Sequence, residues 1–273
     1  MEHKTFMATD EIFGGLHSED DSGILARTLH VLRAVTHAPE PLGNRDLASV
    51  TGIPKATVSR ITTRLVNAGL LRQVRRSERF ALGPGVLELS RAFLDQVDIR
   101  AEFRRAIPPL VEDLGAAAHI GLRDRFDMVL LDTVQPRAAT LVTRLRAGSR
   151  MSLATSAMGR AYLCALSAEE RQALCQTLIR HEQISAQDLS RQLRQAQAEL
   201  EATGFCHSFG EWHPDINAVA TYLVAPDGDV FGLSCGGAAS QLPGDYLLEQ
   251  VVPRLRESIR DLCAETGATS AIT

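Results

Sequence analysis

The stretch LASVTGIPKATVSRITTRLVNAGLLRQ (residues 47–73) contains two short helical patterns separated by a tight turn. Gly52 ends the first pattern, because glycine readily takes the left-handed conformation that closes a helix. In the second pattern, Val58, Ile61 and Leu65 recur at helical spacing and predict one buried stripe. Two helices joined in this way predict a helix-turn-helix whose second helix enters the major groove of DNA.

The side of the second helix opposite that stripe is predicted to be exposed, short-chained and cationic. Hydroxyl groups suit phosphates, and arginine can form two hydrogen bonds to a guanine edge. The candidate DNA contacts of the two helices are Arg45, Lys55, Ala56, Thr57, Ser59, Arg60, Thr63 and Arg64. The alternative is an ordinary solvated helix of a bundle, which would alternate Glu and Lys; no acid occurs between Asp46 and Glu78.

The segments on either side of these two helices complete the pattern. The apolar spacing within residues 23–37 predicts an amphipathic helix before the two helices. Residues 70–82, LLRQVRRSERFAL, predict a β-hairpin with Arg75, Arg76 and Arg79 near its tip. Such a wing would contact the DNA backbone or minor groove, and its contribution to affinity would weaken with salt.

The charge is distributed unevenly along the 273 residues. The net charge of −4 would by itself argue against nucleic acid as a partner. Residues 1–22 carry −5, residues 23–83 carry +7 from ten basic and three acidic residues, and residues 84–273 carry −6. The near-neutral total therefore hides a basic module, which favours DNA binding over a chance cluster of solvated arginines.

The N-terminal part resembles the winged helix-turn-helix of IclR-type bacterial transcription regulators. The resemblance rests on GILARTLHVLRAV (23–35), on residues 47–73 and on RFALGPGVLELS (79–90), in family order and spacing. One departure is the wing turn, where Arg76-Ser77-Glu78 stands in place of the Asp or Gly common in relatives. The resemblance implies double-stranded operator or promoter DNA as a partner.

A long helix is predicted to follow the wing. Val86, Leu89, Phe93 and Val97 form an apolar stripe after Pro84. The stripe suits a partner helix, although the domain's own core is the alternative. In the family that the chain resembles, this helix links the domains and helps to dimerise them, so we expect a homodimer or a dimer of dimers.

The remaining chain alternates strand-like and helix-like segments, which predicts an α+β domain. A helix should follow Pro108-Pro109 and end near Gly115. Strands are expected over 117–124, 127–135, 139–148, 204–209, 217–225 and 229–237, and helices over 155–165, 168–180, 187–202 and 242–265.

This second part also resembles the IclR family, whose effector domain is a sheet-based sensor related to GAF and PAS folds. The matching segments are GSRMSLATSAMGRAYL (148–163) and residues 204–242. The resemblance implies effector contacts at Leu153, Ala157, Met158, Trp212, His213, Asn217, Ser234 and Gly236. Asn217 and Gly236 stand where many relatives have Cys and Ser. A pocket edged by Trp212, His213 and Asn217 suits an aromatic or other organic acid.

The expected division is a disordered acidic tail (1–21), a winged helix-turn-helix (22–83), a linker helix (84–103) and an effector-binding domain (104–273). The expected function is a sequence-specific DNA-binding transcriptional regulator, repressor or activator, whose operator affinity a small molecule controls. The alternative is a small-molecule-processing enzyme with an appended helical module. We expect no catalytic residues and no cofactor, because no HExxH, P-loop or dinucleotide motif occurs.

The cysteines suggest a reducing compartment, because they are five in number, scattered and without a CxxC pair. Cys206, His207, His213 and Cys235 allow a metal-site interpretation, but their spacing fits no standard zinc pattern and structural or pocket roles are favoured. No signal-peptide pattern and no apolar run of membrane-spanning length occurs. We therefore expect a cytoplasmic protein that has no membrane partner.

Overall fold

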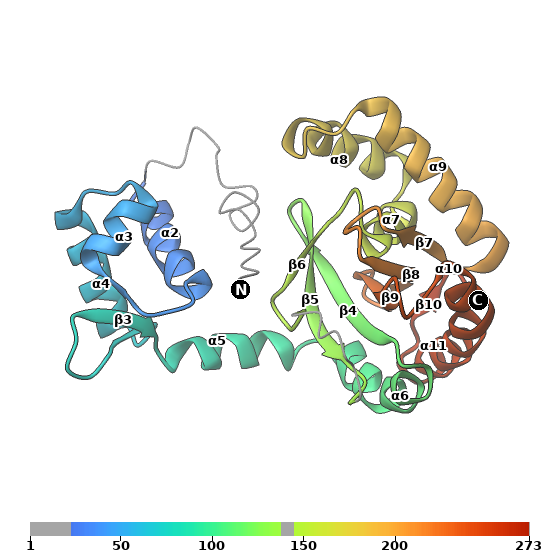
Figure 1. Ribbon diagram of the computed structural model, residues 1–273, viewed down its shortest axis with the longest axis horizontal. Coiled ribbons are helices and arrows are strands. Elements are labelled where there is room, and N and C mark those ends of the chain that lie inside the picture. The colour runs from blue at the N-terminus through green and yellow to red at the C-terminus, as the bar shows by residue number, and fades with distance from the viewer. Residues whose placement is uncertain (1–22, 138–144, 273) are drawn as a thin grey trace. The chain divides into compact units, whose positions relative to one another are not determined.

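The computed structural model describes residues 23–137 and 145–272. They form two compact units that divide between Gln96 and Val97, and each unit has its own arrangement of helices and strands (Figure 1). The acidic tail expected over 1–21 lies outside the described residues. No helix in the described part of the chain has the length and apolar character that crossing a membrane requires.

The described part of the first unit, residues 23–96, is a helical bundle with a small sheet. Its elements are α2 (Ile24–His37), β1 (Leu42–Gly43), α3 (Asn44–Thr51), α4 (Lys55–Asn67), β2 (Leu71–Gln73), β3 (Arg79–Leu82) and α5 (Gly85–Leu94). The stripe predicted for α4, Val58, Ile61 and Leu65, is buried in the core as expected. The amphipathic period of the sequence thus determines which side of α4 remains exposed.

The helix-turn-helix and the wing are held by local geometry. Gly52 closes α3 with φ of 68°, a left-handed conformation that glycine adopts without steric cost. The buried Thr62 of α4 donates its hydroxyl hydrogen bond to Asn44 Oδ1 of α3 at 3.0 Å. The predicted hairpin of β2 and β3 is present, and β1 adds a third strand through the pairing of Leu42 with Phe80. The first unit is therefore a winged helix-turn-helix.

The single linker helix expected over 84–103 is replaced by two helices. α5 ends at Leu94, and α6 (Asp98–Leu114) begins after three intervening residues. Val97 has φ of −110° and ψ of 85°, which lies outside the helical region, and Asp98 places an acid at the start of α6, where the helix dipole favours it. The expected stripe therefore ends with Phe93 on α5 instead of continuing to Val97.

The second unit, described over 97–137 and 145–272, is built on an antiparallel sheet. Its strands are β4 (Ala117–Asp124), β5 (Asp127–Val134), β6 (Arg150–Ser152), β7 (Cys206–Phe209), β8 (Ile216–Val224), β9 (Val230–Ala238) and β10 (Thr269–Ser270). The strand order is β10-β8-β9-β4-β5-β6, with β7 also paired to β8. Besides α6, its helices are α7 (Ala157–Ala165), α8 (Ala168–His181), α9 (Ala186–Thr203), α10 (Gly244–Tyr246), a π-helical turn (Leu247–Val251) and α11 (Val252–Thr266).

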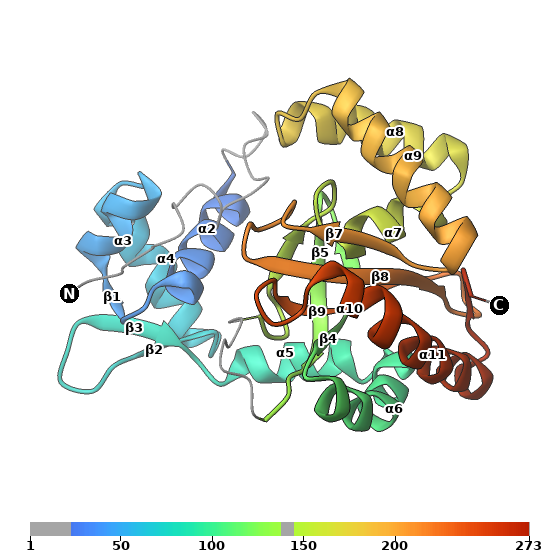
Figure 2. The same cartoon turned by 45° about the vertical axis from the view of Figure 1, so that its right-hand side comes forward.

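The helices cover both faces of this sheet. Figure 2 shows α8 and α9 on one side of the sheet and α6 and α11 on the other. α7 packs against β8 and β9 and against α9. Gly159 lets the first turn of α7 pack closely against the segment that precedes it, because a Cβ at this position would lie 2.3 Å from the Leu153 carbonyl oxygen.

Two expectations for this unit need correction or lie largely beyond the described residues. The helix expected after Pro108-Pro109 begins before them, because α6 contains both prolines. Its buried apolar side chains, among them Phe103 and Ile107, offset the roughly 3 kcal/mol that an interior proline costs. Most of the strand expected over 139–148 lies outside the described residues, and residues 145–148 are not in a strand.

Candidate functional site

The first candidate site is the exposed side of α4. Lys55, Ala56, Ser59, Arg60, Thr63 and Arg64 are exposed there, Thr57 is half-buried, and Arg45 is exposed on α3. The Thr63 hydroxyl donates to the Ser59 carbonyl oxygen at 2.8 Å, so it lies along the helix and shortens the reach of this side chain. The longer arginines therefore project farthest from the helix. The surface is cationic and capable of hydrogen bonding along three turns.

The wing separates the three arginines predicted at its tip. Arg75 and Arg76 are exposed in the turn between β2 and β3, where Arg76 has φ of 61°. Arg79 lies in β3, and its guanidinium donates to the Pro41 carbonyl oxygen at 2.8 Å and pairs with Asp46 at 3.3 Å. Arg79 thus ties the wing to α3 and to the segment before it, whereas the other two arginines are exposed to solvent.

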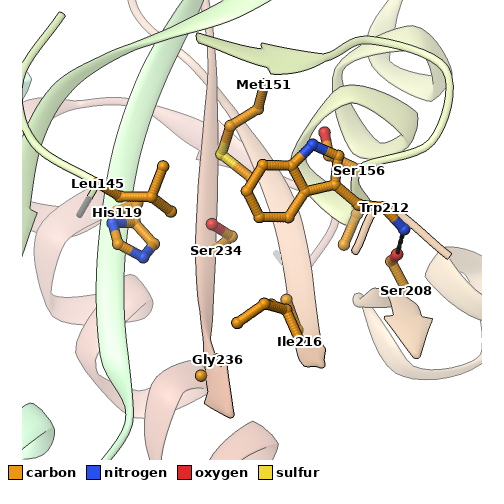
Figure 3. A pocket seen from close by; sticks show the side chains of 12 residues that line it. His119, Leu145, Met151, Ser156, Ser208, Trp212, Ile216, Ser234 and Gly236 are labelled. Carbon is orange, nitrogen blue, oxygen red and sulfur yellow. Dashed lines mark hydrogen bonds between the residues drawn. The ribbon is translucent and has the colours of Figure 1, made fainter. Parts of the chain in front are cut away.

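The second candidate site is a cavity in the second unit, next to the start of α7. Its empty space, including the open mouth and adjoining solvent, is about 420 Å³. The lining residues are His119, Leu145, Met151, Ser156, Ala157, Ser208, Trp212, Ile216, Ala218, Ser234, Gly236 and Gly237. In Figure 3 the Trp212 indole lies beside Met151, and His119 and Leu145 lie across the cavity from Ser208. No carboxylate, lysine or arginine is among these lining residues of the described chain.

His119 is the titratable group of this cavity wall. It lies on β4, where it pairs with Ser234 of β9 and Thr133 of β5, and its Nδ1 is 3.2 Å from Thr133 Oγ1. Burial away from water disfavours the imidazolium form and lowers the pKa of His119 to about 4. The ring is therefore neutral at pH 7, so it offers the cavity a polar group without a charge.

Two hydroxyl groups, on the side of the cavity opposite His119, fix the shape of the cavity wall there. The Ser156 hydroxyl donates to the Ser152 carbonyl oxygen at 2.6 Å and caps α7 by accepting from the Gly159 N–H at 3.0 Å. The Ser208 hydroxyl donates to the Thr155 carbonyl oxygen at 3.1 Å. The start of α7 and the end of β7 are thus joined where they border the cavity.

Four of the eight predicted effector positions line this cavity: Ala157, Trp212, Ser234 and Gly236. The other four do not. Leu153 and Met158 are fully buried in the core behind it. Asn217 donates from its side chain to the Leu242 carbonyl oxygen at 3.0 Å, because side chains alternate along β8 and its neighbours Ile216 and Ala218 take the cavity side. His213 Nδ1 accepts from the Asp215 N–H at 3.2 Å.

Sequence reasoning missed several of the lining residues. His119 carried a usable signal, since it is a polar residue inside the apolar strand pattern AAHIGLRD (117–124). Met151 and Leu145 carried none, because they belong to a short strand and a loop without a distinct pattern. Ser208 was visible only as part of the segment 204–242 that resembles the family.

The residues that suggested a metal site have separate partners. His207 Nδ1 lies 3.0 Å from Glu199 Oε2, and its ring stacks on Phe209. Cys206 Sγ donates to the Ala157 carbonyl oxygen at 3.4 Å, and burial raises the pKa of the Cys235 thiol to about 12. The described residues contain no group of three or more His, Cys, Asp or Glu side chains placed to hold a metal ion.

A winged helix-turn-helix with a cationic recognition face, joined in one chain to a sheet-based unit with a small-molecule cavity, defines the class of ligand-responsive DNA-binding regulators.

Comparison with known proteins agrees with that class. The model of the IclR helix-turn-helix domain matches residues 24–75, and that of the bacterial transcriptional regulator IclR C-terminal domain matches residues 91–264. The HTH-type transcriptional regulator TsaQ1/TsaQ2 of Comamonas testosteroni is 30% identical over 248 residues, 89% of this chain and 88% of the relative. An IclR family regulator from Brucella abortus is 37% identical, with a TM-score of 0.72 over 90% of this chain and 94% of that one.

A further solved structure shares the fold. An IclR homolog from Microbacterium hydrocarbonoxydans, complexed with 4-hydroxybenzoate, is 17% identical and has a TM-score of 0.67 over 88% of this chain and 97% of that one.

The chain belongs to the IclR family of bacterial transcriptional regulators. It is a regulator with a helix-turn-helix DNA-binding domain and a C-terminal effector-binding domain, and not an enzyme.

Proposed function

We propose that α4 reads operator DNA through its exposed side and that the wing adds contacts to the backbone. The observation that carries this is the exposure of Arg60 and Arg64 on the side of α4 opposite its buried stripe. Arg45, Lys55, Ser59 and the wing arginines Arg75 and Arg76 supply phosphate contacts; Arg79 stabilises the wing instead. The division of the chain near residue 96 supports a DNA-binding part that ends with α5.

The effector is, in this proposal, a small aromatic or aliphatic organic acid. Its apolar part lies against Trp212, Met151 and Ala218, and its polar end meets uncharged groups: the His119 ring, the Ser234 hydroxyl and the first N–H groups of α7. The 4-hydroxybenzoate complex of the Microbacterium homolog supports an aromatic acid as the first ligand to test. Leu153 and Met158 support the wall from behind, and Asn217 and His213 act on the cavity only through the backbone that they hold.

Calorimetry with a panel of aromatic and aliphatic acids tests this proposal, and a cavity-filling variant locates the site. Ala218→Leu adds three carbons to the cavity wall, so we expect acid affinity to fall about tenfold or more because ligand atoms and leucine compete for the same space. Ala225→Leu, in the turn after β8, is the control and should bind as the unchanged protein does. The proposal is contradicted if no acid of the panel binds the unchanged protein more tightly than in the millimolar range. It is also contradicted if Ala218→Leu binds the acid as tightly as the unchanged protein does.

We propose further that the regulator acts as a homodimer through α5. This helix has no buried residue, and Leu87, Leu89 and Phe93 are 70%, 62% and 49% exposed. An amphipathic helix with its apolar side uncovered is not stable alone in water, and a second copy supplies a matching apolar surface. Two-fold pairing of helix-turn-helix units also matches the repeated half-sites of typical operators.

Placing charge on this stripe tests the dimer. We expect the Leu89→Glu, Phe93→Glu double variant to shift toward the monomer in analytical ultracentrifugation and to bind operator more weakly, because burying an unpaired carboxylate at the interface is costly. Arg91→Glu, also exposed on α5, changes the net charge by the same two units and is the matched control for helix and charge. A double variant that remains dimeric at micromolar concentration would refute the α5 interface.

Effector control follows by linkage. If the acid binds one arrangement of the dimer more tightly, it shifts the population toward that arrangement and changes operator affinity by the same coupling free energy. Selection of bound DNA from a random pool, with and without the acid, gives the operator, the half-site spacing and the direction of the effect together. If the bound acid leaves the operator affinity unchanged, the proposed effector control of DNA binding is contradicted.

A further inference from the structure

Arg160, in the first turn of α7, is a buried cation beside the cavity. Its side chain is 3% exposed, and it is not itself a lining residue. Nε donates to the Ala154 carbonyl oxygen at 3.1 Å, and one terminal nitrogen donates to the His207 carbonyl oxygen at 3.3 Å and pairs with the Glu211 carboxylate. The other terminal nitrogen is buried and has no hydrogen-bond partner among the described residues.

Glu211 belongs to the short loop that carries Trp212 into the cavity wall. The loop joins β7 to β8, and Gly210 turns it with φ of 72°. The backbone N–H of Trp212 donates a hydrogen bond to the Ser208 hydroxyl at 3.3 Å, which is drawn in Figure 3. The Ser208 hydroxyl in turn donates to the Thr155 carbonyl oxygen. Glu211 itself is exposed, so its carboxylate reaches the buried guanidinium from the solvent side.

Breaking the ion pair would cost Arg160 more free energy than Glu211, and this difference favours one position of the loop. Glu211 can be solvated by water if the loop moves away, but Arg160 cannot, because the core encloses it. A buried cation that loses its carboxylate incurs a large desolvation penalty. The loop position that pairs Glu211 with Arg160 is therefore strongly preferred, and it is the position in which Trp212 borders the cavity.

We propose that Arg160 is a positioning residue of the effector cavity, because its buried guanidinium anchors Glu211 and so holds the Trp212 loop against the start of α7. The inference rests on the proposed effector function of this cavity. It assigns to the Arg160–Glu211 pair, whose members lie 51 positions apart in the sequence, the task of keeping the tryptophan wall in place. The alternative is an ordinary ion pair, whose loss lowers stability and leaves the cavity unchanged.

The tryptophan provides a direct measurement that requires no ligand. Trp212 is the single tryptophan among the 273 residues, so intrinsic fluorescence reports this loop alone. In Glu211→Gln, we expect a red-shifted emission maximum and stronger acrylamide quenching, and Glu211→Asp should restore both in part because it keeps the charge. Ile259→Val, in the core of α11, is a control of modest destabilisation and should change neither.

Binding of 4-hydroxybenzoate, measured by calorimetry, is the second readout. We expect Glu211→Gln and Arg160→Lys to weaken it about tenfold while folding stays cooperative, because the wall no longer has one preferred position. Stronger quenching together with weaker binding supports the inference. Unchanged quenching in Glu211→Gln overturns it, and so does unchanged affinity when quenching has risen.

The two readouts separate the inference from the proposed function. If the unchanged protein binds no acid of the panel, the proposed effector class fails, and the quenching of Glu211→Gln still decides whether the ion pair positions Trp212.

Discussion

The operator affinity of the Arg60→Ala, Arg64→Ala double variant is expected to fall by about 30-fold to 25,000-fold. Each arginine that contacts a base or a phosphate contributes about 1–3 kcal/mol, and the two side chains lie on the same exposed side of α4. Neither side chain is part of the buried stripe of α4, so the unit should fold as before. A mobility-shift or anisotropy titration with the selected operator gives the value.

The control for this variant removes the same charge elsewhere. Arg191→Ala with Arg194→Ala deletes two exposed arginines from α9, in the effector-binding unit. Its operator affinity should stay near that of the unchanged protein, whereas the α4 variant should also show a shallower dependence of affinity on salt. Equal affinities for the two double variants would mean that α4 does not read the operator.

The second large effect is a loss of stability on acidification that depends on His119. Burial lowers the pKa of His119 to about 4 in the folded protein, and in an unfolded chain it is about 6.5. Between these values the unfolded chain binds the additional proton, so stability is full above pH 6.5 and falls as the pH decreases toward 4. The shift corresponds to about 3 kcal/mol over this range.

Urea denaturation followed by Trp212 fluorescence measures this effect in the effector-binding unit. His119→Asn keeps a polar side chain opposite Thr133 but removes the titration, so its free energy of unfolding should change less between pH 7.5 and pH 5 than that of the unchanged protein. The carboxylates titrate in both proteins, so their contribution to the pH dependence cancels in the comparison. Identical pH dependence in the two proteins would show that His119 is not buried as a neutral ring.

Neutral His119 also bears on which ligands the cavity accepts. The described residues that line the cavity carry no charged side chain, so an acid's carboxylate is left to hydroxyl and backbone N–H groups, which bind it less strongly than arginine would. Shape against Trp212 and Met151 then determines selectivity to a greater degree than charge. This is the physical reason to include aliphatic and aromatic acids of equal charge in the same panel.

Much of the first unit could be predicted from the sequence. The stripe of Val58, Ile61 and Leu65, with glycines at both ends of its pattern, determined α4 and its exposed side. The position of Arg79 could not be predicted, because its partners Pro41 and Asp46 lie more than 30 residues earlier in the chain. The end of α5 at Leu94 was missed because the apolar period continues to Val97 while the backbone does not.

In the second unit, the sequence determined the kind of most of the longer elements and the family, whereas β6, β10 and the π-helical turn were not predicted. The family-like segment 148–163, which includes the start of α7, and the segment around Trp212 were the parts of the sequence that pointed to this cavity. Asn217 was assigned to the cavity from the family pattern, yet the alternation of side chains along β8 turns Asn217 to Leu242 and Ala218 to the cavity. A shift of one residue along a strand is enough to exchange the two faces.

The sequence by itself thus determined what local periodicity encodes: a basic winged helix-turn-helix and a sheet-based sensor domain of the IclR family. Only the tertiary structure decided which side chains meet. His119 reaches the cavity because β4 pairs with β9, and Arg160 reaches Glu211 because α7 packs under the loop after β7. Hydrophobic spacing specifies which face of an element is buried, whereas the partner of that face depends on contacts between distant parts of the chain.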